Sequence, residues 1–155
     1  MKMLENDNLP KEEEVIIVWG DLTNFVKILN AKGNLELYYW LSEYSEFVGK
    51  EVELNDGTVL KYIADGFIAI FPANKVKNIE NILEKLQNDV NDMLKNKGID
   101  SQIYIKASIG KVALGELGTK NNKHIDIFGN TVNELFKIKS DKLVFSKELL
   151  EKLNS

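Results

Sequence analysis

Two aspartates stand where strands are expected to end, and together they could bind a hard divalent cation. Asp21 follows the apolar, β-branched run of residues 12–20, and Asp65 lies with Gly66 between two further apolar runs. If the first strand and the later hairpin lie side by side, the two carboxylates meet at one edge of the sheet. Close carboxylates repel unless a cation lies between them, and Mg²⁺ or Mn²⁺ typically takes few protein carboxylates together with substrate phosphates. The pattern therefore indicates a metal site.

The segment after Asp21 could bind an anion. A helix expected from Leu22 would present free backbone N–H groups to the same space, and such groups bind anions. A cation site beside an anion site indicates a nucleoside triphosphate. A simpler interpretation stays open: Asp21 caps the following helix, and Asp65 occupies a turn that favours aspartate.

A third carboxylate, Asp126, lies in the segment HIDIFGNTVN of residues 124–133. Its neighbours Ile125, Ile127 and Phe128 are apolar. A carboxylate in such partly dry surroundings needs a partner. Asp126 is therefore a further candidate for a binding role.

The hydrophobic pattern predicts the elements that must position these residues. Strands are expected over residues 12–20, 58–64, 66–71, 101–118 and 142–146, and helices from Leu22 to 29, over 35–48, 74–97 and 147–153, and within 126–138. Asp65 and Gly66 between two β-branched runs predict a tight hairpin. Residues 119–124 are expected to form a polar loop, which leaves His124 solvated or at a subunit contact.

This order of elements predicts an α+β fold, namely a ferredoxin-like α/β sandwich with a mixed, mainly antiparallel sheet and helices packed on it. A chain of 155 residues with 44% hydrophobic and 28% charged residues suits one globular domain with its own core. We expect that domain over residues 13–155, preceded by a flexible lead-in over residues 1–12.

Composition narrows the function. The absence of cysteine excludes disulfides, thiolate metal sites and cysteine nucleophiles. A net charge of −4 without a basic stripe argues against nucleic acid as a partner. The apolar runs are too short for membrane insertion and the acidic N-terminus is unlike a signal peptide, so a cytoplasmic protein is expected. All 20 basic residues are lysine, so no planar guanidinium fork is present.

Three segments resemble motifs of the class III nucleotidyl cyclases, whose catalytic domain makes cyclic nucleotides from nucleoside triphosphates. IIVWGDLTNF (residues 16–25) and GTVLKYIADGFIAIF (57–71) are similar to the two metal motifs of that family. DIFGNTVN (126–133) is similar to its base-recognition and catalytic segment. The resemblance covers roughly residues 13–153.

The resemblance implies a role for each matching residue. Asp21 and Asp65 would bind two divalent metal ions, Mg²⁺ or Mn²⁺, with help from the backbone carbonyl of Leu22. The phosphate-facing helix start would comprise Leu22, Thr23, Asn24 and Phe25.

The remaining matches concern the nucleoside. Lys61 and Asp126 would select the base, Asn133 would orient the ribose, and Lys137 would take the place of a transition-state arginine. The family's site forms between two subunits in head-to-tail contact, which implies a homodimer.

Base chemistry favours ATP as the substrate. Adenine presents a ring-nitrogen acceptor beside an amine donor, which suits the cationic donor Lys61 and the anionic acceptor Asp126. Guanine presents the reverse order and would leave buried groups mismatched. Cytosine has the same order as adenine, so a pyrimidine cyclase remains an alternative.

The chain also departs from the family pattern. Lys137 supplies charge without a fork, which predicts slow turnover. Asn24 replaces a common glycine. The sequence stops at Ser155, before the segment in which many members place a phosphate-binding lysine, so either the chain is truncated or triphosphate binding is reduced. These departures favour a second alternative, a catalytically weak nucleotide-binding or dimerisation module.

Overall fold

Apolar strands and amphipathic helices alternate along the chain in a computed structural model that describes Leu4 and residues 8–155. The elements are β1 (Lys11–Leu22), α1 (Phe25–Ala31), α2 (Asn34–Leu54), β2 (Thr58–Ile63), β3 (Gly66–Pro72), a 3₁₀ turn η1 (Ala73–Lys75), α3 (Val76–Asn96), β4 (Ile103–Thr119), β5 (Asn122–Phe128), α4 (Asn130–Lys137), β6 (Leu143–Phe145) and α5 (Lys147–Leu153). No helix among the described residues is both long and apolar enough to cross a membrane.

The strands form one sheet in the order β2-β3-β1-β4-β5, with β6 paired to β4. The β6–β4 pairing is parallel, and the other pairings are antiparallel. Strand β1 is central, and its pairing with β4 runs from Lys11 opposite Leu114 to Leu22 opposite Ile103. The expected α+β fold with a mixed, mainly antiparallel sheet is confirmed.

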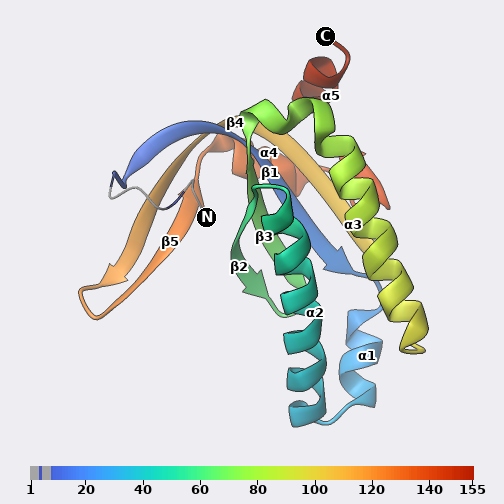
Figure 1. The fold of residues 1–155 in the computed structure, drawn as a ribbon. Helices are drawn as coiled ribbons and strands as arrows, with labels where there is room; N and C mark the ends of the chain where they lie inside the picture. The colour runs from blue at the N-terminus through green and yellow to red at the C-terminus, as the bar shows by residue number, and fades with distance from the viewer. Residues whose placement is uncertain (1–3, 5–7) are drawn as a thin grey trace.

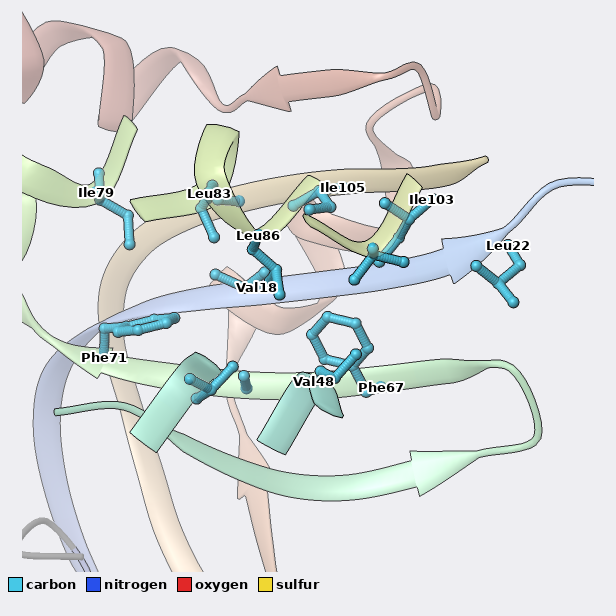
Figure 2. Close-up of a cluster of buried hydrophobic side chains, with 14 of the residues drawn as sticks. Val18, Leu22, Val48, Phe67, Phe71, Ile79, Leu83, Leu86, Ile103 and Ile105 are labelled. Atoms are coloured by element: carbon cyan, nitrogen blue, oxygen red, sulfur yellow. The ribbon is translucent and has the colours of Figure 1, made fainter. Parts of the chain in front are cut away.

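Side chains of β1 alternate between two apolar clusters because successive strand residues point to opposite faces. Ile16 and Val18 belong to the cluster that α2 and α3 cover, and both helices lie on one side of the sheet in Figure 1. Figure 2 shows Leu83 and Leu86 of α3 directed toward Val18. Burial on this face provides the main apolar support for the sheet.

The opposite face holds a smaller cluster. Its buried members are Val15, Ile17, Ile68, Ile70, Val112, Leu114, Ile127 and Leu135. Leu135 comes from α4, which packs closely on β4: a Cβ at Gly110 would lie 2.4 Å from the Thr131 hydroxyl oxygen. This face therefore carries both the end of β1 with Asp21 and the helix with Asn133 and Lys137.

Several boundaries differ from the sequence expectation: β1 ends at Leu22 and α2 continues to Leu54, both later than expected. Strand β1 begins at Lys11, so residues 11 and 12 lie in the sheet, while residues 1–3 and 5–7 of the expected lead-in lie outside the described residues. Helix α1 begins at Phe25, three residues later than expected.

The expected polar loop over residues 119–124 is mostly strand, because β4 and β5 form a hairpin in which His124 lies opposite Leu117. Figure 1 shows this hairpin extending away from the helices. The residues of its tip are exposed on both sides, so no apolar alternation marks them as strand.

Candidate active site

The two metal-motif aspartates meet where β1 ends beside the β2–β3 hairpin. Gly20 lies opposite Phe67 near the start of β3. One carboxylate oxygen of Asp65 accepts a hydrogen bond from the backbone N–H of Leu22 at 2.9 Å, and the Tyr44 hydroxyl donates to the Asp65 carbonyl at 3.1 Å. The second motif is therefore held against the first, and Asp65 has a second carboxylate oxygen for another partner.

The hairpin turn is one residue earlier than the sequence predicts. Ile63 pairs with Gly66, so the two turn residues are Ala64 and Asp65. Ala64 has a φ of 54°, a conformation that is costly for a residue with a Cβ. Gly66 lies in the strand instead, where an added Cβ would lie 2.4 Å from the Trp19 ring.

Electrostatics couple the two aspartates. Burial raises the pKa of Asp21, and the negative charge of Asp65 raises it further. The positive charge of Lys106 and a hydrogen bond from Trp19 lower the pKa of Asp21 in part. Burial also raises the pKa of Tyr44, with contributions from both aspartates. Negative charge is thus concentrated at this edge of the sheet.

The donor set at this edge fits a divalent cation. Two carboxylates provide hard oxygen ligands, and their mutual repulsion would be relieved by a bound positive charge. Within the described part of the chain, no group of three or more His, Cys, Asp or Glu side chains gathers to hold a metal. A cation bound by Asp21 and Asp65 would therefore retain positions for water or phosphate oxygens, as Mg²⁺ usually does.

The expected phosphate-binding start of α1 is only partly available. The N–H of Leu22 is bonded to Asp65, and the N–H of Thr23 donates to the Gln102 carbonyl at 2.9 Å. The sequence predicts that these two N–H groups are free, and that prediction is wrong. The Thr23 amide is hydrogen-bonded to the segment before β4, and the Leu22 amide to the β2–β3 turn. Phosphate binding through backbone amides would therefore rest on Asn24 and Phe25.

The backbone conformation of Asn24 shows why glycine would also suit this position. Its φ of 59° and ψ of 23° lie in the left-handed region, which glycine enters freely and asparagine tolerates better than most residues. The Asn24 side-chain amide donates to the Asp100 carbonyl at 3.4 Å. This departure from the family pattern therefore keeps the local backbone intact.

The base-selecting residues expected from the sequence also meet. The Lys61 ammonium nitrogen lies 3.1 and 3.2 Å from the two carboxylate oxygens of Asp126. Strands β2 and β5 are the two ends of the sheet order, so these side chains come together because the sheet curls rather than because their strands pair. The partner that Asp126 requires is a lysine of the same chain.

Helix α4 presents Asn133 and Lys137 one turn apart, and both are exposed. The Lys137 ammonium forms an ion pair with Glu134 at 3.1 Å. The sequence predicts roles for Asn133 and Lys137 on this helix but none for Glu134.

The carboxylate and lysine side chains of the site form two separate pairs within one chain. Asp21 lies with Asp65, and Lys61 lies with Asp126. Among the residues that the structure describes, no hydrogen bond or ion pair joins one pair to the other. For the roles expected from the sequence, we call Asp21 with Asp65 the metal-type half-site and Lys61 with Asp126 the base-type half-site.

Three residues that support the site were not predicted from the sequence. Trp19 and Lys106 lower the pKa of Asp21, and the Tyr44 hydroxyl donates to the Asp65 carbonyl. Trp19 had a usable signal, since it stands two positions before Asp21 and so on the same strand face. Lys106 had another, a lysine within the apolar run IYIKASIG.

The fold is that of nucleotide cyclase domains. The structure is similar to the guanylyl cyclase Cya2, with a TM-score of 0.82 and 18% identity over 94% of this chain and 81% of that one. It is similar to the adenylyl cyclase CyaB from P. aeruginosa, with a TM-score of 0.82 and 15% identity over 93% and 82%. The guanylate cyclase domain of RhGC from Catenaria anguillulae in complex with GTP gives a TM-score of 0.79 and 19% identity over 94% and 85%.

The sequence defines the family directly. The profile of the Adenylate and Guanylate cyclase catalytic domain matches residues 8–143, and the chain belongs to this family. Uncharacterized proteins of Mycobacterium bovis and Mycobacterium tuberculosis are each 23% identical over 125 residues, which is 80% of this chain and 22% of theirs. The chain thus spans about a fifth of the length of these curated relatives.

Proposed function

We propose that residues 13–155 form one catalytic domain that converts ATP to 3′,5′-cyclic AMP and pyrophosphate at a homodimer interface. The observation that carries this proposal is the Lys61–Asp126 pair, whose ammonium and carboxylate lie 3.1 Å apart in a member of the cyclase family. A cationic donor beside an anionic acceptor matches the Watson–Crick edge of adenine.

Binding of adenine would exchange one ion pair for two hydrogen bonds. The side chains of Lys61 and Asp126 are 39% and 26% exposed, so a base can reach both. Lys61 would donate to the adenine ring nitrogen, and Asp126 would accept from the amine. Guanine reverses this order, and its carbonyl would face the Asp126 carboxylate.

The other half-site would hold the triphosphate. Asp21 and Asp65 would bind two divalent ions, Mg²⁺ or Mn²⁺, which supply positive charge for the triphosphate and for the attacking 3′-oxygen. Asn133 would orient the ribose, and Lys137 would place its charge near the α-phosphate after leaving Glu134. These residues act by position and charge, and none serves as a covalent nucleophile.

Separation of the half-sites supports assembly from two copies. Head-to-tail association would bring the aspartate pair of one chain to the base-type half-site of the other. Exposed apolar residues are available for such an interface, including Tyr62 and Ile63 on β2 and Phe136 on α4, which are 43%, 52% and 45% exposed. Burying them between two chains would be favourable.

The direct test is a product assay with ATP, GTP, CTP and UTP, each with Mg²⁺ and with Mn²⁺. We expect cyclic AMP as the main product, and Asp65→Ala should lose it. Cyclic CMP as the main product would support the pyrimidine alternative. Absence of any cyclic product above the Asp65→Ala background would refute cyclase activity.

A second candidate function follows from Lys137, which is bound to Glu134 and has no guanidinium fork. The domain would then bind ATP with little turnover. Calorimetry that shows ATP binding without product would favour this alternative. We expect Lys137→Arg to raise kcat by roughly tenfold, because a fork stabilises the transition-state phosphate better than a point charge.

A further inference from the structure

Lys106 is a buried lysine with no carboxylate partner among the described residues. It lies in β4 and is 6% exposed. Lysine is rarely buried without a partner, because desolvation of its charge is costly. The described ion pairs do not include Lys106, so other groups must compensate for that cost.

The compensation comes from the end of α4. The Lys106 ammonium donates to the carbonyl of Ile138 at 2.9 Å and to that of Phe136 at 3.4 Å. It also lies 5.7 Å from the centre of the Phe136 ring. Carbonyls at a helix C-terminus lack partners within the helix and carry partial negative charge. Lys106 therefore caps α4 from a neighbouring strand.

The same lysine lies beside the metal-type half-site. Lys106 is directly opposite Trp19 in the β1–β4 register, and Asp21 is two residues farther along the same face of β1. The Trp19 ring packs against Phe136 with centroids 5.3 Å apart. Lys106 and Trp19 thus form a bridge between the strand that carries Asp21 and the helix that carries Asn133 and Lys137.

We propose that Lys106 is a positioning residue for the cyclase reaction, which fixes the C-terminal turn of α4 against the β1–β4 pair. This inference rests on the proposed roles of Asn133 and Lys137. In a head-to-tail dimer, Asp21 and α4 of one chain serve two different sites. Lys106 would then set the spacing between the half-sites of each chain.

The position of Lys106 also predicts an effect on metal binding. The charge of Lys106 acts on Asp21, so the ammonium would also repel a cation held by Asp21. Removal of that charge should tighten binding of a divalent ion by about fivefold, which is the effect of one unit charge on the order of 7 Å away even when it is screened as in bulk water. A residue that only supported folding would not improve metal binding when lost.

The test compares Lys106→Met and Lys106→Arg with the wild type. Lys106→Met should speed hydrogen exchange across residues 130–138, lower kcat by about tenfold and leave the KM for ATP within about twofold. Mn²⁺ binding, measured by calorimetry without nucleotide, should tighten by about fivefold. Lys106→Arg should stay near the wild type in exchange and in Mn²⁺ affinity, because it keeps the charge and the donors.

Lys111→Met is the matched control, because Lys111 is an exposed lysine on the same strand. It should leave exchange, kcat and Mn²⁺ affinity unchanged. If Lys106→Met does not fold, Lys106→Gln replaces it, since Gln keeps one donor but no charge. Gln should give intermediate protection of residues 130–138 and the same gain in Mn²⁺ affinity.

Unchanged exchange over residues 130–138 in a folded Lys106→Met or Lys106→Gln variant would overturn the proposal. Failure of the proposed function would look different, since the wild type would then make no cyclic product. The exchange measurement does not depend on turnover, so it would still decide whether Lys106 fixes α4.

Discussion

At the scale of single residues, Asp21 is held in a state that disfavours its charge. It is half-buried and lies near Asp65, and both factors raise its pKa above the ordinary value of 3.8. The Trp19 hydrogen bond and the charge of Lys106 oppose the increase in part. An ionised carboxylate in this position lowers the stability of the metal-free protein, and a bound cation would offset that cost.

This balance predicts a pH-dependent effect of Asp21→Asn. Because the pKa is raised on folding, the folded protein binds more protons than the unfolded chain above about pH 3.8, and stability falls as pH rises through the raised pKa. With a chelator at pH 7, Asp21→Asn should therefore raise Tm by roughly 1–3 °C. Thermal unfolding followed by circular dichroism measures this change.

The advantage of Asp21→Asn should disappear below about pH 3.8, where the carboxyl is protonated in both states. Added Mn²⁺ should raise the Tm of the wild type and not that of the variant. If Asp21→Asn is less stable than the wild type at pH 7 in chelator, the charged Asp21 side chain does not destabilise the fold and the prediction is wrong.

At the scale of elements, the β2–β3 turn and the end of β1 form one unit. Trp19 occupies the space beside Gly66, Asp65 bonds to the Leu22 amide, and Tyr44 of α2 holds the Asp65 carbonyl. The Trp19 ring then extends to Phe136 of α4. The geometry of the aspartate pair thus depends on a glycine that makes no bond to either carboxylate.

Gly66→Ala tests this dependence. The new Cβ would lie 2.4 Å from a ring carbon of Trp19, so the indole must move. We expect unfolding in urea to show a loss of about 2 kcal/mol, typical of overpacking in a dense site. Tryptophan fluorescence should shift as the ring moves, and Mn²⁺ affinity should fall because the displaced indole moves the end of β1 that carries Asp21.

Gly33→Ala provides the matched control, because a Cβ at Gly33 meets nothing within 4 Å and its φ of −70° suits alanine. It should change stability by less than about 0.5 kcal/mol. Equal effects of the two substitutions would show that the Trp19 contact does not determine the site.

At the scale of the whole molecule, the two proposed half-sites lie apart in one chain. Asp21 and Asp65 lie at one end of the β1–β3 pair, and Lys61 meets Asp126 across the curled sheet. Helix α4 carries the proposed ribose and phosphate residues on the face opposite α2 and α3. A symmetric dimer would use each half-site once, and so form two equivalent sites.

Mixing two inactive variants tests this arrangement. Asp65→Ala removes a proposed metal ligand, and Asn133→Ala removes the proposed ribose contact. In a mixed head-to-tail dimer, one site receives both defects and the other receives none. If half of the dimers are mixed, activity should recover to about a quarter of the wild-type value.

The activity of the mixture should also fall on dilution, because the intact site needs two chains. Each variant alone should remain inactive, which the same cyclic AMP assay checks. Absence of recovery in the mixture, with heterodimers detected by mass spectrometry, would place the complete site within one chain.

Local sequence patterns determined where many of the strands and helices lie. The apolar run of residues 12–20, the amphipathic repeat of residues 74–97 and Gly98 after it predicted β1 and α3 closely, because burial and helix ending depend on local pattern. The motifs around Asp21, Asp65 and Asp126 likewise indicated the family, since they combine residue type with spacing.

Tertiary structure decided what no local pattern contains. The side chains of Lys61 and Asp126 are 65 residues apart and meet because the sheet curls, and the Thr23 amide is taken by Gln102 from a distant segment. The capping of α4 by Lys106 depends on which strand lies beneath that helix. These are long-range contacts, so their geometry follows from the packing of the whole sheet and not from the periodicity of any one segment.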